Sequence, residues 1–211
     1  TVLDWGLQLT AVLAYLHGQK PPILFRDLKP SNILLDTANK IRLIDFGIAR
    51  NFNPEQVTAT FLQGVGSAGY SPLEQYQGTG STDQRSDLYS LGATLYNLLT
   101  GEIPPSPVML ITEGRLVQGP SKLNRNIPPA LDHIIVKLMA LRKDDRYQTV
   151  QEVDLHLRKL AESLSQVDQS TEAFDGGPIV VTSVSAPRTP AAAGPATQVQ
   201  SHRTTQAAPV T

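Results

Sequence analysis

The segment that most constrains the fold is residues 83–99, which end in LYSLGATLYNLL and are followed by Gly101. This segment is apolar on nearly every side, and a helix without a polar face has to be buried. We therefore predict that it forms a helix at the centre of a domain, with other elements packed around it. Because 40% of the 211 residues are hydrophobic, the chain can build such a core, which excludes disorder throughout.

Three further segments have apolar residues at helical spacing. The first covers residues 9–16 and stops at Gly18. A second is expected to begin near residue 128, where two prolines favour a helix start. The third follows Thr149 and Glu152, which form a capping box. Together with one small hairpin, described below, these helices predict a mainly α domain.

The composition changes sharply near Ser165. From there to Thr211 the chain contains no lysine, and alanine, threonine, serine, proline and glutamine dominate. Such a segment cannot bury enough apolar surface to offset the entropy of ordering it. We therefore predict one domain at residues 1–164 and a disordered tail or linker at residues 165–211.

Charge and residue usage exclude several classes of function. The 18 basic and 19 acidic residues give a net charge of −1, which argues against nucleic-acid binding through phosphate neutralisation. The absence of cysteine excludes disulfides, thiolate metal sites and a cysteine nucleophile. The four histidines lie far apart in the sequence without carboxylate neighbours, so no histidine-based metal site is expected. No apolar run approaches the roughly 18 residues of a membrane span, so we expect a soluble, cytoplasmic chain.

Functional residue types concentrate around a predicted hairpin. The strands NILLD and KIRLID flank residues 37–39. A turn before the hairpin can point Asp27 and Asn32 the same way, and the returning strand brings Asp45 to them. Carboxylate and amide oxygens suit Mg²⁺, which keeps phosphate oxygens and water in its other positions. Lys29 adds a charge that can balance a transferring phosphoryl group, and Asp27 can accept a proton from a hydroxyl.

These motifs resemble those of protein kinases. FRDLKPSN and DFG are similar to the catalytic loop H-R-D-L-x-x-x-N and the metal-binding turn D-F-G. Residues 72–74 (PLE) stand at the A-P-E position, and residues 87–92 (DLYSLG) resemble the D-x-W-S-x-G of the central helix. Residues 145–147 (DRY) resemble the site of a late arginine that pairs with the A-P-E glutamate. The resemblance covers roughly residues 1–160 and is greatest to bacterial, eukaryotic-like serine/threonine kinases.

The resemblance implies a role for each matching residue. Asp27 would be the catalytic base, Lys29 the partner of the γ-phosphate, and Asn32 and Asp45 the Mg²⁺ ligands. ATP and Mg²⁺ are thus the implied cofactors, and a protein serine or threonine is the implied acceptor. A lysine two places after Asp27 resembles the serine/threonine class. Ser67 stands where that class has a threonine that touches the catalytic aspartate and lysine.

Other matching residues would regulate or support the reaction. Arg26 resembles the arginine of kinases that are switched on by phosphorylation, and Thr58 and Thr60 are the expected phosphate acceptors. Asp87 is expected to bind the backbone of the catalytic loop, with a simple helix cap as the alternative. Phe25 replaces the motif's histidine, which packs in a hydrophobic column. The expected supporting residues are Phe25, Phe46, Gly47, Glu74, Asp87 and Arg146.

The largest departure from the family is upstream of the catalytic loop. The family has G-x-G-x-x-G-x-V and then a strand lysine there, whereas the residues before Phe25 indicate a helix. We therefore expect this chain to be the larger lobe alone, a fragment that lacks the ATP-covering N-lobe and has negligible activity by itself. The alternative is a non-catalytic module that binds a partner protein. Similar kinases often continue from such a linker into a membrane span or sensor domain, and none is present in these 211 residues.

Residues 64–69 (GVGSAG) spell G-x-G-x-x-G but do not predict a cofactor site. A dinucleotide-binding loop needs a strand before it and a helix directly after it. The sequence YSP that follows does not open such a helix. We expect flexibility at a substrate-docking turn here instead.

Overall fold

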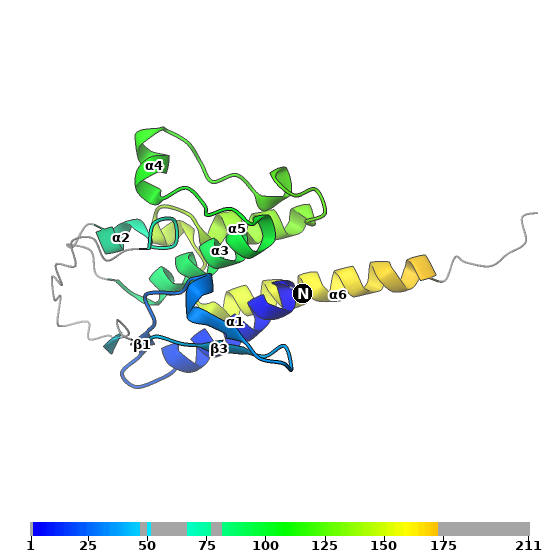
Figure 1. The fold of residues 1–211 in the computed structure, drawn as a ribbon, viewed down its shortest axis with the longest axis horizontal. Coiled ribbons are helices and arrows are strands. Elements are labelled where there is room, and N and C mark those ends of the chain that lie inside the picture. Colours follow the sequence, from blue (N-terminus) through cyan, green and yellow to red (C-terminus); the bar gives the residue numbers. More distant parts are fainter. Residues whose placement is uncertain (1, 47–49, 52–66, 77–81, 173–211) are drawn as a thin grey trace, which may run out of the picture. The chain divides into compact units, whose positions relative to one another are not determined.

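The computed structural model describes residues 2–46, 50–51, 67–76 and 82–172. They belong to the first of two units, Thr1–Ala173, and the second unit, Phe174–Thr211, lies outside the described residues. The α-helices are α1 (Val2–His17), α2 (Leu73–Tyr76), α3 (Gln84–Thr100), α4 (Pro107–Thr112), α5 (Pro129–Leu138) and α6 (Val150–Glu172). The strands are β1 (Ile23–Leu24), β2 (Ile33–Leu35), β3 (Ile41–Leu43) and β4 (Arg50–Asn51). Short 3₁₀ helices lie at Pro30–Asn32, Pro120–Lys122 and Lys143–Asp145. The mainly α fold is as predicted (Figure 1).

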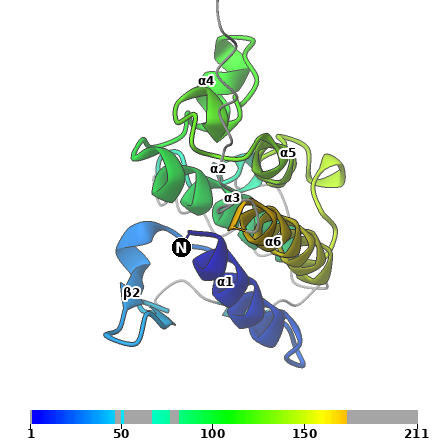
Figure 2. The same ribbon diagram turned by 90° about the vertical axis from the view of Figure 1, so that its right-hand side faces the viewer.

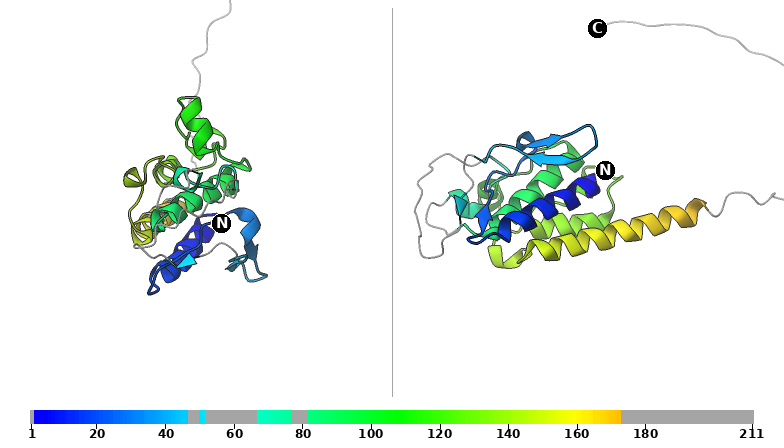
Figure 3. Two further views of the ribbon diagram at one scale, coloured as in Figure 1. Left: turned by 90° about the vertical axis from the view of Figure 1, so that its left-hand side faces the viewer. Right: turned by 90° about the horizontal axis from the view of Figure 1, so that it is seen from below.

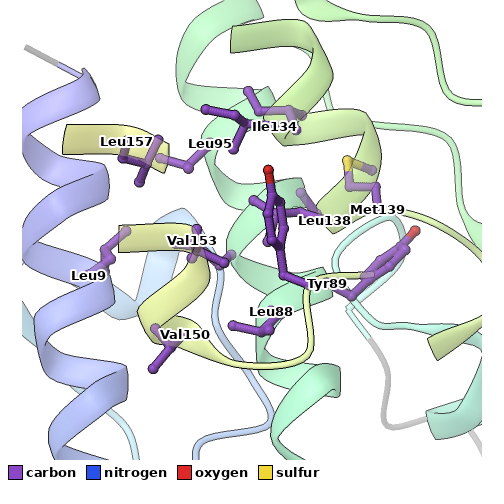
Figure 4. Packing of buried hydrophobic residues seen from close by; sticks show 14 of the residues in the cluster. Leu9, Leu88, Tyr89, Leu95, Ile134, Leu138, Met139, Val150, Val153 and Leu157 are labelled. Carbon is purple, nitrogen blue, oxygen red and sulfur yellow. The ribbon is translucent and has the colours of Figure 1, made fainter. Parts of the chain in front are cut away.

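Helix α3 forms the centre of the domain, as the sequence predicts. Residues 86–96 of this helix are all buried, and α1 and α5 pack against it. The helix begins after Asp83, whose side chain accepts a hydrogen bond from the Arg85 N–H, and ends at Gly101 in the left-handed conformation. Figure 4 shows Tyr89 of α3 among apolar side chains from α5 and α6.

Helices α1, α5 and α6 surround this central helix. Helix α1 buries Leu9, Leu13 and Leu16, and it runs beside α6 in Figure 3. Helix α5 approaches α3 closely at Gly92, where an added Cβ would lie 2.6 Å from Leu138 Cβ. The apolar faces predicted from helical spacing therefore meet in one core.

The predicted capping box is present at the start of α6 in an altered form. The Glu152 N–H donates to Thr149 Oγ1 over 3.3 Å. In return, Glu152 Oε2 accepts the N–H of Gln148 over 3.2 Å. A regular capping box would use the N–H of Thr149 instead, one residue later. The helix start is therefore confirmed, with the second bond shifted by one residue.

Helix α6 extends further than the sequence predicts. The tail was expected to begin at Ser165, and the helix instead continues to Glu172. Residues 165–172 contain no glycine or proline, and each residue added to an existing helix gains one backbone hydrogen bond. The domain boundary expected at residue 164 is therefore corrected to the end of this helix, and residues 173–211 lie outside the described part of the chain.

Two small antiparallel sheets flank the loop of residues 25–32. Strands β2 and β3 form the predicted hairpin, with residues 33–35 opposite residues 41–43, and it lies beside α1 in Figure 2. Its turn is closed by Asp36, whose side chain accepts the N–H groups of Ala38 and Lys40, both at 2.9 Å. Strands β1 and β4 form the second sheet. Their two residues each are too few to show an alternating pattern, which is why the sequence did not reveal them.

Helix α4 lies on the opposite side of α3 from α1 (Figures 1 and 2). Its N-cap is Ser106, whose hydroxyl accepts the Met109 N–H over 3.3 Å. Several large apolar side chains of residues 103–123 are exposed around this helix. Across the described residues, none of the helices combines the length and the apolar character that a membrane crossing requires.

Candidate active site

Asp27, Lys29 and Ser67 form a closed set of contacts. Lys29 Nζ donates to Ser67 Oγ over 2.8 Å and lies 2.8 Å from Asp27 Oδ2. The Ser67 hydroxyl donates in turn to Asp27 Oδ1 over 3.0 Å. The side chains of Asp27 and Lys29 are partly exposed, so both are accessible from solvent. The contacts that the sequence predicts for Ser67 are present, and its function stays a prediction.

Asn32 lies next to this set and is almost fully buried. Its side-chain amide donates to the backbone oxygen of Asp27 over 2.8 Å and to Asp27 Oδ2 over 2.9 Å. Both bonds use the amide nitrogen, so the amide oxygen of Asn32 is directed away from Asp27. The Ile44 N–H donates to the backbone oxygen of Asn32 over 3.0 Å. This bond continues the β2–β3 ladder, and Asp45, which has a positive φ of 61°, is the next residue after Ile44. The joint role expected for Asn32 and Asp45 stays a prediction.

Asp87 anchors the backbone at the start of the loop of residues 25–32. Its carboxylate is completely buried and accepts the N–H groups of Phe25 over 2.9 Å and of Arg26 over 2.7 Å. Arg26 has φ of 69°, a conformation that costs about 1–3 kcal/mol and persists only where the surroundings enforce it. The role of helix cap belongs to Asp83. The structure thus has Asp87 in the loop-anchoring position and not in the capping position.

His17 also contacts Asp87, which the sequence did not reveal. His17 Nε2 lies 2.9 Å from Asp87 Oδ2, and both side chains are buried. The expectation that the histidines lack carboxylate neighbours is therefore wrong for His17. The two residues are 70 positions apart in the chain, and only the packing of α1 against α3 brings them together. No cluster of three or more histidine, aspartate or glutamate side chains suited to a metal occurs among the described residues.

The remaining residues of the two kinase-like motifs fall partly outside the described chain. Phe25 is fully buried and contacts Phe46 edge to face, with 5.1 Å between the ring centroids. This is the apolar packing expected where Phe25 replaces histidine. The Arg26 guanidinium contacts the Thr82 hydroxyl. Gly47, Thr58 and Thr60 lie outside the described residues.

Glu74 and Arg146 form a buried ion pair. Two bonds join their side chains, at 2.7 Å and 3.1 Å. Arg146 is 2% exposed and also donates to the backbone oxygens of Arg85, Ala140 and Leu141. The pairing that the resemblance implies for these two residues is present, and it joins α2 to the turn before α6.

A second polar contact that the sequence did not reveal holds the hairpin. The side chain of Gln8 on α1 donates to the backbone oxygen of Asn39 over 3.1 Å and accepts the Ile41 N–H over 3.0 Å. Trp5 Nε1 donates to Asn39 Oδ1 over 3.0 Å. A two-stranded hairpin is only marginally stable by itself. These bonds therefore help to fix the hairpin that carries Asn32 and Asp45.

Asp83 stabilises the fold in a pH-dependent way. Burial raises the pKa of Asp83, but bonds from Arg85 and Lys143 outweigh it and lower the pKa below its usual value. A lowered pKa adds stability above the unfolded pKa of about 4, and this stability is lost as the pH falls through the folded value.

We expect Asp83→Asn to reduce the free energy of unfolding by about 1–2 kcal/mol at pH 7, because it removes two charge-assisted bonds. The loss of stability between pH 5 and pH 3 should also be smaller than in the parent chain. Urea unfolding at several pH values measures both effects. Asp144→Asn is the matched control, because Asp144 bonds to the same Arg85 but is mostly exposed. Equal acid sensitivity of the parent and Asp83→Asn would contradict the prediction.

Comparison with known proteins agrees with this geometry. The sequence profile of the protein kinase domain matches residues 2–171. A probable serine/threonine-protein kinase of Clostridium perfringens is 35% identical over 175 residues, which cover 81% of this chain and 25% of the relative. The serine/threonine-protein kinase PknB of Mycolicibacterium smegmatis is 38% identical over 155 residues, or 69% of this chain and 24% of the relative. PrkC of Bacillus subtilis, also a serine/threonine-protein kinase, is 34% identical over 152 residues, or 70% and 23%.

The chain therefore belongs to the protein kinase domain family, as the motifs predict. It is similar to bacterial serine/threonine-protein kinases over 69–81% of its length. The chain spans about a quarter of the length of these curated relatives.

Proposed function

We propose that this chain carries the catalytic residues of a serine/threonine protein kinase. Such an enzyme transfers the γ-phosphoryl group of ATP to a serine or threonine hydroxyl of a protein, with Mg²⁺ as cofactor, and we place the reaction in the cytoplasm. The closed set of Asp27, Lys29 and Ser67, with Asn32 bonded to Asp27, is the observation that supports the proposal. A module that only binds a partner has no use for all of these residues in contact.

In the proposed reaction, Asp27 accepts the proton of the acceptor hydroxyl. The bonds from Ser67 and Asn32 fix the orientation of its carboxylate, which matters because phosphoryl transfer depends mainly on positioning and electrostatics. Lys29 supplies a positive charge beside Asp27 and can balance charge on the transferring group. Ser67 contacts both and is a positioning residue.

Asn32 and Asp45 fit the requirements of Mg²⁺. The amide oxygen of Asn32 and the carboxylate of Asp45 are hard oxygen donors, and Asp45 directly follows Ile44, whose N–H donates to the backbone oxygen of Asn32. Mg²⁺ commonly uses one or two protein ligands and takes the others from phosphate and water, so two donors are enough. When bound, the ion neutralises charge on the phosphate oxygens.

The proposal also needs groups that cover ATP. The family supplies a glycine-rich loop and a strand lysine before the catalytic loop, and residues 2–24 contain neither in this chain, since α1 occupies most of them. We propose that a smaller lobe, outside these 211 residues, provides them.

The experiment compares two purified proteins with labelled ATP, Mg²⁺ and a mixture of protein substrates. One is the 211-residue chain, and the other is the product of the reading frame extended upstream of the codon for Thr1. We expect the longer product to place phosphate on serine and threonine, and the 211-residue chain to remain at background. If the longer product contains a glycine-rich loop and a strand lysine but transfers no phosphate, the proposed function is wrong. Strong transfer by the 211-residue chain, lost in Asp27→Asn, would contradict the need for a second lobe.

A further inference from the structure

The peptide bonds on either side of Asp27 are held one after another by side chains. Asp87 accepts the N–H groups of Phe25 and Arg26, at 2.9 Å and 2.7 Å. After Asp27, the Asn32 side chain donates to the Asp27 backbone oxygen over 2.8 Å. The peptide plane between Arg26 and Asp27 lies between these contacts. It needs a contact of its own to stay in one orientation, because each plane can rotate about the single bonds on its two sides.

Gln75 of helix α2 supplies this contact. Its side-chain amide donates to the backbone oxygen of Arg26 over 3.1 Å, although the two residues are 49 positions apart in the chain. Both backbone polar groups of Arg26 are thus bonded to side chains, one on α3 and one on α2. Arg26 needs such support, because its φ of 69° is disfavoured for a residue with a side chain.

Helix α2 is itself fixed to the core of the domain. The carboxylate of Glu74, the residue before Gln75, is buried and pairs with Arg146. It also accepts the Ser86 hydroxyl over 2.8 Å. Gln75 is therefore held in place through its neighbour, and its half-buried side chain can fix the carbonyl group that it contacts.

Different parts of the chain hold the two ends of Asp27. Ser67 and Asn32 contact its carboxylate oxygens, whereas Gln75 holds the peptide plane from which the residue starts. A rotation of that plane would swing the carboxylate away from an acceptor hydroxyl, and a displacement of about 1 Å can cost roughly 10²-fold in rate. Gln75 can therefore affect the reaction without touching a reactant.

We propose that Gln75 is a positioning residue for phosphoryl transfer, which acts by fixing the peptide plane between Arg26 and Asp27. The inference rests on the proposed kinase function and adds a residue outside the catalytic-loop and D-F-G motifs. The group that matters is the N–H donor of the side-chain amide. Gln75→Glu keeps the size of the side chain but has no donor at neutral pH, and it regains one when the introduced carboxyl is protonated.

One NMR signal of the 211-residue chain reports this peptide plane directly. The pair Arg–Asp occurs once in the sequence, at positions 26 and 27. Labelling arginine carbonyl carbons with ¹³C and aspartate nitrogens with ¹⁵N therefore yields one correlated signal. We expect Gln75→Glu to shift its ¹³C frequency at pH 7, because the carbonyl loses a donor. Gln84→Glu is the matched control and should leave the signal in place, since Gln84 donates in the same way to the backbone oxygen of His17.

Kinetics of the product extended upstream of Thr1 test the effect on the reaction. We expect Gln75→Glu to lower kcat roughly tenfold or more at pH 7.5. The KM for ATP should stay within twofold, because Gln75 acts through the backbone beside Asp27. The ratio of variant to parent kcat should rise as the pH falls from 8 toward 5, since protonation of the introduced carboxyl restores the donor. Gln84→Glu should keep kcat within twofold of the parent and show no such rise.

The outcomes distinguish a failure of this proposal from a failure of the kinase proposal. If the extended parent transfers phosphate and the two variants have equal kcat, the role of Gln75 is overturned while the kinase function stands. An NMR signal that does not move has the same consequence. A fall in kcat without recovery at low pH also overturns the role, because a merely structural loss would behave in this way. If the extended parent transfers no phosphate, the kinase proposal fails, and the positioning role fails with it.

Discussion

Replacement of Asp27 by asparagine is expected to lower kcat for phosphoryl transfer by about 10²–10⁴-fold, the usual contribution of a general base. The amide is close in size to the carboxylate and can still accept from Ser67, but it cannot take the proton of the acceptor hydroxyl. The KM for ATP should change little, because Asp27 contacts the acceptor in the proposed reaction. Steady-state kinetics with the form of the protein that transfers phosphate measures both constants.

The matched control is a substitution at Ser67 that keeps its contacts with Asp27 and Lys29. Ser67→Thr retains the hydroxyl that donates to Asp27 and accepts from Lys29, so it should preserve most of the activity. Thermal unfolding should show that Asp27→Asn remains folded. An Asp27→Asn variant with activity within threefold of the parent would contradict the role of Asp27 as the base.

The second large effect is expected on stability, from Arg146→Met. The substitution leaves the buried carboxylate of Glu74 without its cation, and three backbone oxygens lose a donor. Breaking a buried ion pair on one side typically costs about 3–5 kcal/mol. Because whole domains are stable by about 5–15 kcal/mol, a large fraction of this variant should be unfolded in mild urea. Urea unfolding followed by circular dichroism measures the change.

Arg142→Met provides the comparison. Arg142 has the same charge and lies four positions earlier in the sequence, but its side chain is 78% exposed. Its ion pair is also long, with 3.9 Å between Arg142 Nε and Asp145 Oδ2. Exposed pairs of this kind contribute about 0–1 kcal/mol. If the two variants differ by less than 1 kcal/mol, the buried pair does not have the proposed structural importance.

Much of the fold follows from local patterns in the sequence. The all-round apolar segment predicts α3, and the glycine at its end predicts the stop, because both depend on residues close in the chain. The hairpin of β2 and β3 is likewise predicted from neighbouring residues, and the kinase-like motifs are short stretches that can be read one by one. The contacts of Asp27 with Ser67 and of Glu74 with Arg146 are distant in the chain, and only the family resemblance predicts them.

The parts that sequence reasoning missed depend on how helices pack. The His17–Asp87 contact and the Gln8 bonds to the hairpin join α1 to residues at least 31 positions away. The residues around a single histidine or glutamine on a helix form no pattern that predicts a bonding partner so distant in the chain. The end of α6 was misplaced for another reason, since polar composition resembles a linker while nothing in residues 165–172 interrupts a helix.

The buried carboxylate of Asp87 has a consequence for how the proposed activity could be regulated. Asp87 bonds the backbone of Phe25 and Arg26 to helix α3, whose residues 86–96 are all buried. This part of the loop therefore cannot separate from α3 without opening the core. The free energy needed to open the backbone at Phe25 and Arg26 should therefore approach that of global unfolding. Any signal that switches the proposed activity then has to act on elements that open at a lower free-energy cost than the backbone beside Asp27, the proposed base.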